Sequence, residues 1–125
     1  MRRLGSGSPW EDVVGYSRVV RTGDLVFVSG TTGTRDGVLV DGGAAEQTRQ
    51  ALTNVLAALD RVGAGAADVV RTRLYVTDSA QWEAVGRVHG EFFGAHRPAT
   101  AMVQVAALID PAMVVEVEAD AVVQP

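Results

Sequence analysis

Cysteine is absent from this 125-residue sequence, and its absence removes several kinds of chemistry together. Disulfides, thiolate nucleophiles, zinc ribbons and iron–sulfur clusters all require cysteine ligands or thiols. Only two histidines are present, so a dedicated transition-metal site is not expected either. The sequence therefore predicts no metal centre.

Long apolar runs and an excess of positive charge are also missing. No stretch approaches the ~20 apolar residues that a membrane-spanning helix needs. Residues 1–6 lack the apolar segment of a secretory signal, so cytoplasmic location is the default expectation. The net charge is -4 and the pI is near 5.0, whereas nucleic-acid binders gain affinity from clustered Lys and Arg. Neither a membrane nor a nucleic acid is expected as a partner.

The composition that remains is that of an ordinary globular protein. Hydrophobic residues make up 47% of the chain and charged residues 21%. A chain of this length buries enough surface for a hydrophobic core of its own. We therefore expect a single domain over residues 1–125, in which residues 1–14 form an N-terminal segment that can be partly flexible.

Hydrophobic periodicity predicts an α+β fold. The predicted elements are strands at 16–21 and 25–29, a loop at 33–43, a helix at 44–62, a strand at 69–77, a second helix that opens at Asp78 and stops before Arg97, and strands at 101–106 and 113–122. The apolar stripe of the first helix contains Leu52, Val55, Leu56, Leu59 and Val62, and Gly63 is placed to end that helix as a left-handed cap. The apolar stripe of the second helix contains Trp82, Val85, His89, Phe92 and Phe93. The resulting order, ββαβαββ, places two helices on one face of a mixed sheet.

The last strand predicts that the second face of this sheet carries charge. Val115, Val117, Ala119 and Ala121 alternate with Glu116, Glu118 and Asp120, so the acidic side chains point away from the helices. Arg71 and Arg73 are expected on the same face, and Val70, Thr72, Leu74 and Val76 on the other side of their strand, toward the core. These charges can pair across neighbouring strands, or the face can be covered by another copy of the chain.

Short motifs are spread along the chain from Gly15 onward. They are Gly15-Tyr16-Ser17, Leu25-Val26-Phe27-Val28-Ser29-Gly30, Gln47-Thr48-Arg49-Gln50 with Asn54, Asp68-Val69-Val70-Arg71-Thr72, Tyr75-Val76-Thr77-Asp78, Phe92-Phe93-Gly94, His96-Arg97-Pro98-Ala99 and Val115-Glu116-Val117-Glu118-Ala119. None is specific alone, but together they resemble, in kind and in order, the motifs of the Rid family (reactive intermediate deaminases, YjgF/YER057c/UK114).

The resemblance implies a chorismate-mutase-like fold assembled as a homotrimer, with ligand clefts between subunits. It also implies hydrolysis of enamines or imines without a cofactor. In the family, an arginine after the Pro-Ala pair binds the substrate carboxylate, and a glutamate on the last strand positions or activates water. Glu116 matches that glutamate. Thr100 stands at the position of the family's arginine, and it offers one hydroxyl in place of a charged guanidinium group.

Other positions that match the family's cleft complete the expected site. Tyr16, Ser29, Gly30 and Thr31 are expected to orient the ligand. Two further matches depart from the family pattern: Met102 replaces a cysteine or similar small residue, and Gly86 replaces an asparagine on the second helix.

Several residues of this site admit two interpretations. Glu116 can be a general base or can pair with a strand neighbour. Tyr16 can donate to a ligand or pack at a subunit boundary. His89 can act in catalysis or be a hydrogen-bonded core residue. Arg97 or Arg18 can replace the missing arginine if either reaches the cleft.

The expected function is deamination of an enamine or imine, or a related proton transfer such as tautomerisation or cyclisation, acting on a small metabolite. Activity on simple 2-imino acids should be weak because Thr100 cannot bind a carboxylate as arginine does. The alternative is a trimer that binds a small ligand without catalysis.

Overall fold

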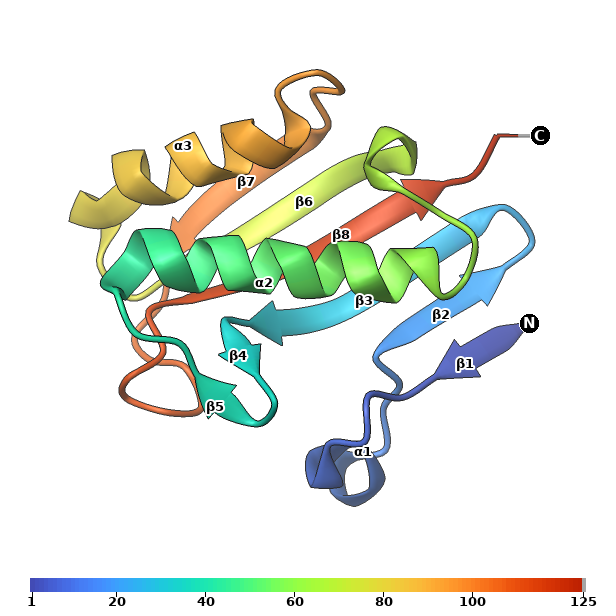
Figure 1. Ribbon diagram of the computed structural model, residues 1–125, viewed down its shortest axis with the longest axis horizontal. Coiled ribbons are helices and arrows are strands. Elements are labelled where there is room, and N and C mark those ends of the chain that lie inside the picture. The colour runs from blue at the N-terminus through green and yellow to red at the C-terminus, as the bar shows by residue number, and fades with distance from the viewer. Residues whose placement is uncertain (125) are drawn as a thin grey trace.

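The computed structural model describes residues 1–124 and shows a six-stranded mixed sheet with two long helices on one face (Figure 1). The strand order is β1-β2-β3-β8-β6-β7, and every neighbouring pair is antiparallel except β6 and β7. The α+β fold predicted from the sequence is confirmed. The elements of the sheet and the helices are β1 (Arg2–Leu4), α1 (Pro9–Val14), β2 (Val19–Thr22), β3 (Leu25–Thr32), α2 (Gly43–Asp60), β6 (Val69–Val76), α3 (Trp82–Phe93), β7 (Ala99–Gln104) and β8 (Val115–Val122).

Four short elements were not predicted. β1 and α1 lie in residues 1–14, and the two-residue strands β4 (Thr34–Arg35) and β5 (Val38–Leu39) pair within the loop predicted at 33–43. Elements of two to six residues contain too few positions for a hydrophobic period to show. Two 3₁₀ turns, Ala66–Asp68 and Ser79–Gln81, connect α2 to β6 and β6 to α3.

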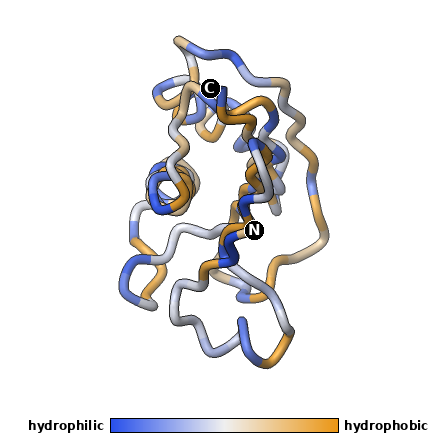
Figure 2. The backbone as a smooth tube through the Cα atoms, turned by 90° about the vertical axis from the view of Figure 1, so that its right-hand side faces the viewer, coloured by the Kyte–Doolittle hydropathy of each residue, from blue (hydrophilic) through white to orange (hydrophobic). Residues whose placement is uncertain are grey.

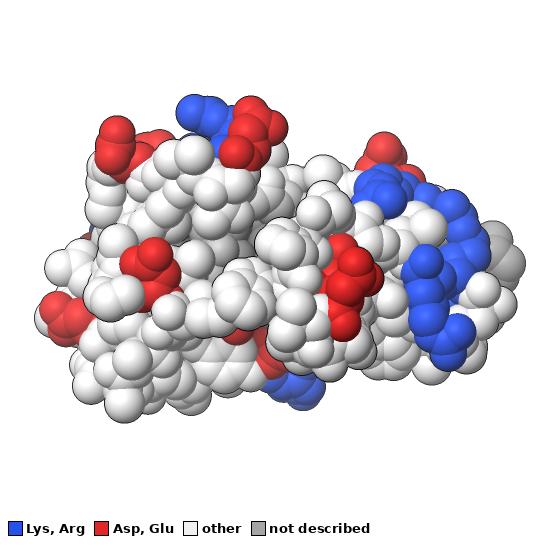
Figure 3. Space-filling model, turned by 90° about the horizontal axis from the view of Figure 1, so that it is seen from below, with Lys and Arg blue, Asp and Glu red and all other residues white. Residues whose placement is uncertain are grey.

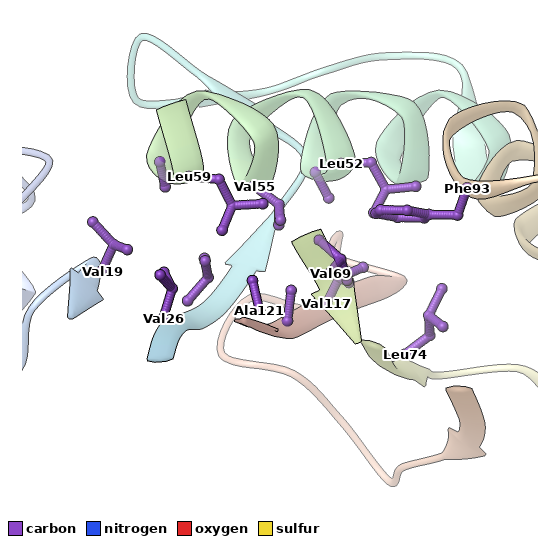
Figure 4. Packing of buried hydrophobic residues seen from close by; sticks show 14 of the residues in the cluster. Val19, Val26, Leu52, Val55, Leu59, Val69, Leu74, Phe93, Val117 and Ala121 are labelled. Carbon is purple, nitrogen blue, oxygen red and sulfur yellow. The ribbon is translucent and has the colours of Figure 1, made fainter. Parts of the chain in front are cut away.

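The core lies between α2, α3 and the sheet. Leu52, Val55 and Leu59 are fully buried and point from α2 toward Val26 and Val117 of the sheet (Figure 4). Burying an aliphatic side chain of this size contributes about 1.5–3 kcal/mol. Figure 2 looks along α2 and shows the helix and the sheet as two layers. The predicted stripe of α2 and the inward side of β8 are confirmed.

Two predicted orientations are wrong. Val70 was expected to face the core with Thr72, but the ladder is irregular between Val69 and Arg71. This bulge turns Val69 inward and leaves Val70 48% exposed. Trp82 was expected on the apolar stripe of the second helix and is 62% exposed at the start of α3. None of the helices in the described part of the chain combines the length and the apolarity needed to cross a membrane.

Arginines close the C-terminal end of α2. Arg21 Nη1 donates to the carbonyl of Val62 at 2.6 Å, and Arg2 Nη2 donates to the carbonyl of Arg61 at 2.8 Å. Cationic side chains at this end complement the partial negative charge of the helix terminus. Gly63 follows with φ 78°, the left-handed conformation predicted for it. Basic side chains gather at the end of the molecule that carries the chain termini (Figure 3).

The face of the sheet opposite the helices carries the charges predicted for it. Arg73 and Asp120 pair across β6 and β8 at 3.1 Å, and Tyr75 donates a hydrogen bond to Glu118. The predicted cross-strand pairing is therefore present at Arg73. Phe27 of β3 remains 45% exposed among these polar groups, although β3 is a central strand. In one chain this face is not covered by any helix.

Candidate functional site

Glu116 and Gly30 meet where β3 departs from regular pairing. The register of β3 and β8 shifts between Val28 and Thr31, and Thr32 then pairs with Glu116. Glu116 Oε2 would lie 2.5 Å from a Cβ placed on Gly30. Only glycine lets the carboxylate approach the backbone this closely. The bulge and the glycine together therefore give the Glu116 side chain its position.

Arg18 holds the backbone around this carboxylate. Its Nη1 donates to the carbonyls of Gly30 at 2.6 Å and Ser29 at 3.2 Å, and to Thr31 Oγ1 at 2.9 Å. Its Nη2 lies 3.4 Å from Tyr16 Oη, and its guanidinium stacks 5.6 Å from the centre of the Tyr16 ring. The structure thus brings Tyr16, Ser29, Gly30 and Thr31 together around a half-buried arginine.

The surroundings of Glu116 favour its protonated form. Burial raises the pKa of the Glu116 carboxyl above its ordinary value of 4.5, and the nearby Glu118 carboxylate raises it further. The Arg18 guanidinium opposes these effects. The alternative expected for Glu116, an ion pair with a strand neighbour, is not formed among residues 1–124. A carboxyl with a raised pKa holds its proton more readily than an ordinary glutamate, which suits a group that takes a proton and returns it.

A second polar group lies beneath α3. Thr100 Oγ1 is 2.7 Å from Thr72 Oγ1, and Thr72 Oγ1 is 2.8 Å from His89 Nε2. Thr72 is fully buried, His89 is half-buried and Thr100 is exposed. Burial lowers the pKa of His89, so its imidazole is neutral at pH 7. Its ring also contacts Phe93, with 4.8 Å between the ring centres.

Met102 and Gly86 adjoin this second group. Met102 follows Thr100 by two residues on β7 and packs against the core from the same face. A Cβ on Gly86 would meet nothing nearer than Met102 Cε, at 4.0 Å. The absence of a side chain at Gly86 therefore leaves space above Met102, one helical turn before His89.

The two groups lie on opposite faces of the sheet. Glu116 alternates with the buried Val115 and Val117, so its side chain points away from the helices. Thr100 bonds to Thr72, whose hydroxyl reaches His89 of α3 on the helix side. One chain therefore does not unite all the predicted site residues.

Neither arginine considered as a replacement lies beside Thr100. Arg18 belongs to the Glu116 group, where it is half-buried. Arg97 is exposed, adopts a φ of 56° and donates to the carbonyl of Gly94. The described residues contain no group of three or more His, Asp or Glu side chains that could hold a metal ion.

A shallow hollow of about 480 Å³ lies beside Tyr16, lined also by Arg3, Glu11 and Ser17. It includes neither Glu116 nor Thr100. Glu11 accepts hydrogen bonds from Ser6 and Gly7, which tie the N-terminal segment to α1. Of the predicted site residues, Tyr16 lines this hollow, whereas Glu116 and Thr100 do not.

Sequence reasoning missed Thr72 and the part played by Arg18. Thr72 is a polar residue on the buried side of an alternating strand, and such a residue requires a hydrogen-bond partner. That signal was available in the sequence. The contacts of Arg18 were not, because they depend on a bulge in β3 that brings the Ser29 and Gly30 carbonyls toward the start of β2.

Comparison with known proteins identifies the family. The profile of the family described as Endoribonuclease L-PSP matches residues 8–123. The chain belongs to this family, also called YjgF/YER057c/UK114. Family membership agrees with the motifs of the sequence and with the order of strands in the sheet.

Relatives within the YjgF/YER057c/UK114 family are similar over almost the whole chain. An uncharacterized protein of Streptomyces coelicolor is 40% identical over 97% of this chain and 91% of its own length. The human 2-iminobutanoate/2-iminopropanoate deaminase is 33% identical over 100% of this chain and 93% of its own. The crystal structure of Rv2704, a family member from Mycobacterium tuberculosis, is 53% identical, covers 98% of both chains and superposes with a TM-score of 0.90.

Proposed function

We propose that this protein hydrolyses an enamine or imine to a carbonyl compound and ammonia, in a cleft formed between copies of the chain. Family membership and the deaminase activity named for the human relative support the reaction class. The observation that carries the proposal is the Glu116 carboxyl, half-buried against Gly30 with a raised pKa and no ion-pair partner among residues 1–124. A group of this kind can move protons to and from water.

Glu116 serves two proton transfers in this reaction. As the oxygen of water bonds to the imine carbon, Glu116 takes a proton from that water and delivers it to the imine nitrogen, giving a carbinolamine. Glu116 then takes the hydroxyl proton and passes it to the amino group. The carbon–nitrogen bond breaks, the carbonyl forms and ammonia leaves. An enamine first becomes the imine by taking a proton at carbon.

The residues around Glu116 orient the substrate and the water. Tyr16 Oη offers a donor, and the hydroxyls of Ser29 and Thr31 line the same backbone segment. Arg18 occupies the carbonyls of Ser29 and Gly30, so its charge remains close to Glu116 without neutralising it in an ion pair. This charge also stabilises the carboxylate form that accepts the first proton.

Thr100 makes simple 2-imino acids poor substrates. A charge-assisted hydrogen bond to a carboxylate contributes about 1.5–3 kcal/mol, which a neutral hydroxyl does not supply. The expected penalty in substrate binding is roughly ten- to a hundredfold. Met102 and Gly86 shape the adjoining part of the cleft, and His89 lies behind it.

The cleft requires self-association, and a homotrimer is the assembly we propose. Its support is the placement of Glu116 and Thr100 on opposite faces of one sheet, together with Phe27 exposed on the uncovered face. An exposed apolar side chain among paired charges is typical of a surface that meets another copy. A small metabolite is the ligand; the net charge of -4 disfavours RNA.

Ammonia release tests the proposal. Imines are generated in the assay from amino acids by an amino-acid oxidase, and ammonia formed above the spontaneous rate is measured. Wild-type protein should accelerate the release weakly, because these imines are 2-imino acids, and Glu116→Gln should abolish the acceleration. Glu83→Gln is the matched control, because Glu83 is an exposed acid paired with Arg87 on α3. Equal rates for wild type and Glu116→Gln would contradict the proposal and favour a protein that binds its ligand without catalysis.

A further inference from the structure

A chain of hydrogen bonds leads from the surface of the sheet into the core. It begins at the exposed Thr100, passes through the fully buried hydroxyl of Thr72 and ends at His89 Nε2. The two links measure 2.7 and 2.8 Å, so both are well formed. Thr100, Thr72 and His89 are all uncharged when the His89 imidazole is neutral.

Five arginines of the protein bind groups other than Thr100, Thr72 and His89. Arg18 binds the Ser29 and Gly30 carbonyls, and Arg73 pairs with Asp120 on the opposite face. Arg49 is held between Glu46 and Glu91, Arg87 pairs with Glu83, and Arg97 donates to Gly94. Among residues 1–124 no arginine hydrogen-bonds to Thr100, Thr72 or His89. The Thr100 hydroxyl therefore has no arginine partner among residues 1–124.

We propose that Thr72 and His89 determine the substrate class, by making Thr100 the outer end of a neutral hydrogen-bond chain that binds an uncharged polar group of the substrate. This inference rests on the proposed function, because it assigns the recognition of that same substrate. The preferred substrates carry a carboxamide, ester or ketone oxygen where a 2-imino acid carries its carboxylate. Thr72 acts through its neighbours and is a positioning residue.

The direction of the chain decides what Thr100 presents. When His89 Nε2 carries the proton, it donates to Thr72, Thr72 donates to Thr100, and the Thr100 proton is free to point at a substrate oxygen. In the other tautomer every hydrogen bond reverses, and Thr100 offers a lone pair. A hydroxyl without Thr72 behind it has no fixed direction. The hydrogen bonds through Thr72 to His89 therefore determine whether the Thr100 hydroxyl donates to the substrate or accepts from it.

The neighbouring surface suits an uncharged group as well. Met102 packs against the core two residues after Thr100, and the missing side chain at Gly86 leaves space above it. A carboxylate placed beside the thioether would lose water without gaining an opposite charge. An amide or ester would lose less, because it carries no charge and its carbonyl oxygen can hydrogen-bond to Thr100.

Paired product analogues test this assignment. The probes are 2-oxobutanamide and 2-oxobutanoate, which differ only in the carboxamide and the carboxylate. Their dissociation constants are measured with wild type, Thr72→Val, Thr72→Ser and Thr100→Arg, and the ¹⁵N shift of His89 Nε2 is followed during each titration. Valine matches the shape of threonine but removes the hydroxyl, whereas serine retains it. Thermal unfolding of each variant confirms that the fold is kept.

Wild type should bind the amide at least about tenfold more tightly than the carboxylate, and the His89 Nε2 shift should move on amide binding. Thr72→Val should reduce the preference to near one, Thr72→Ser should restore it, and Thr100→Arg should reverse it. Equal or tighter binding of the carboxylate by wild type would overturn the inference. An unchanged preference in a folded Thr72→Val would do the same.

These results separate the inference from the proposed function. Ammonia release that depends on Glu116, without any amide preference, overturns the inference alone. An amide preference that depends on Thr72, with no ammonia release from any imine, supports the inference and contradicts the proposed catalysis. The absence of binding by both probes at millimolar concentration overturns the inference, whatever the ammonia assay gives.

Discussion

The Glu116 carboxylate lies directly over the bare backbone of Gly30, in the place that a side chain at position 30 would occupy. A Cβ there would stand 2.5 Å from Glu116 Oε2 and 3.0 Å from its carboxyl carbon. Arg18 fixes the same stretch of backbone through the Gly30 carbonyl. The position of the carboxylate thus depends on a glycine, and substitution of that glycine tests the site without touching its charge.

Gly30→Ala should displace the Glu116 side chain and lower the Glu116-dependent activity at least tenfold. The free energy of unfolding should change little, because the overlap is with the end of a flexible side chain that can move away. Activity and urea unfolding measure the two effects. Gly65→Ala is the control, since a Cβ on Gly65 meets nothing within 4 Å and its φ of -142° suits any residue. Full activity in Gly30→Ala would show that the carboxylate does not need this position.

The raised pKa of Glu116 predicts a pH dependence of both activity and stability. The carboxylate is the form that takes a proton from water, so kcat/KM should rise with pH through a value above 4.5. The folded state holds the proton more tightly than the unfolded chain does. The free energy of unfolding should therefore fall as pH rises through the window between the two pKa values, and the loss should be complete above it.

Glu116→Gln should abolish the activity and remove the contribution of Glu116 to the pH dependence of stability. Comparison of its unfolding curves with those of wild type, from pH 4 to about 8, isolates the contribution of this one group. A wild-type protein that gains stability relative to Glu116→Gln as pH rises through that window would mean that the pKa of Glu116 is lowered. The account of Glu116 as a partly desolvated acid would then be wrong.

The Glu11 carboxylate holds the N-terminal segment against α1 by hydrogen bonds. It accepts hydrogen bonds from the Ser6 hydroxyl at 2.6 Å and from the Ser6 and Gly7 N–H groups. The Ser6 hydroxyl is the main cause that lowers the pKa of Glu11, so this stabilisation is present at neutral pH and is lost in acid, as pH falls through the lowered pKa.

Glu11→Gln should destabilise this segment by about 1–3 kcal/mol and speed hydrogen exchange at Ser6 and Gly7. Asp12→Asn makes the same change at the next, exposed position and should have little effect. Unchanged exchange at Ser6 in Glu11→Gln would show that the segment is held by other contacts.

Thr100→Arg should increase ammonia release from 2-imino acids by roughly ten- to a hundredfold, because a guanidinium supplies the charge-assisted contact that the hydroxyl lacks. Thr53→Arg introduces the same residue on the exposed face of α2 and should leave the rate unchanged. No gain in Thr100→Arg would mean that position 100 does not face the substrate carboxylate.

The sequence predicted the fold well where periodicity was long. The eight-residue alternation of β8 and the stripe of α2 identified the core residues Val117, Leu52 and Val55, because burial imposes a regular spacing on such elements. Val70 and Trp82 were misplaced for local reasons. A bulge reversed the alternation at Val70, and a 3₁₀ turn changed the start of α3.

The candidate site was predictable only in part. Family motifs pointed to Glu116, Tyr16 and Thr100, but motifs carry no information on which face of a sheet a residue occupies. The separation of Glu116 from Thr100 follows from the parallel register of β6 and β7, which aligns Thr100 with the buried Thr72. Pairing registers of this kind arise from tertiary packing and cannot be read along the chain.

Mixing two inactive variants tests the central claim, that one active site takes its groups from different copies. Glu116→Gln removes the proton-transfer group, and Gly86→Trp fills the space beside Met102. Each protein alone should be inactive. The two variants are unfolded and refolded together in equal amounts. About a quarter of the sites should then contain both intact groups, so about a quarter of the wild-type activity should return. If mass spectrometry shows mixed assemblies but no activity returns, the site does not lie between copies of this chain.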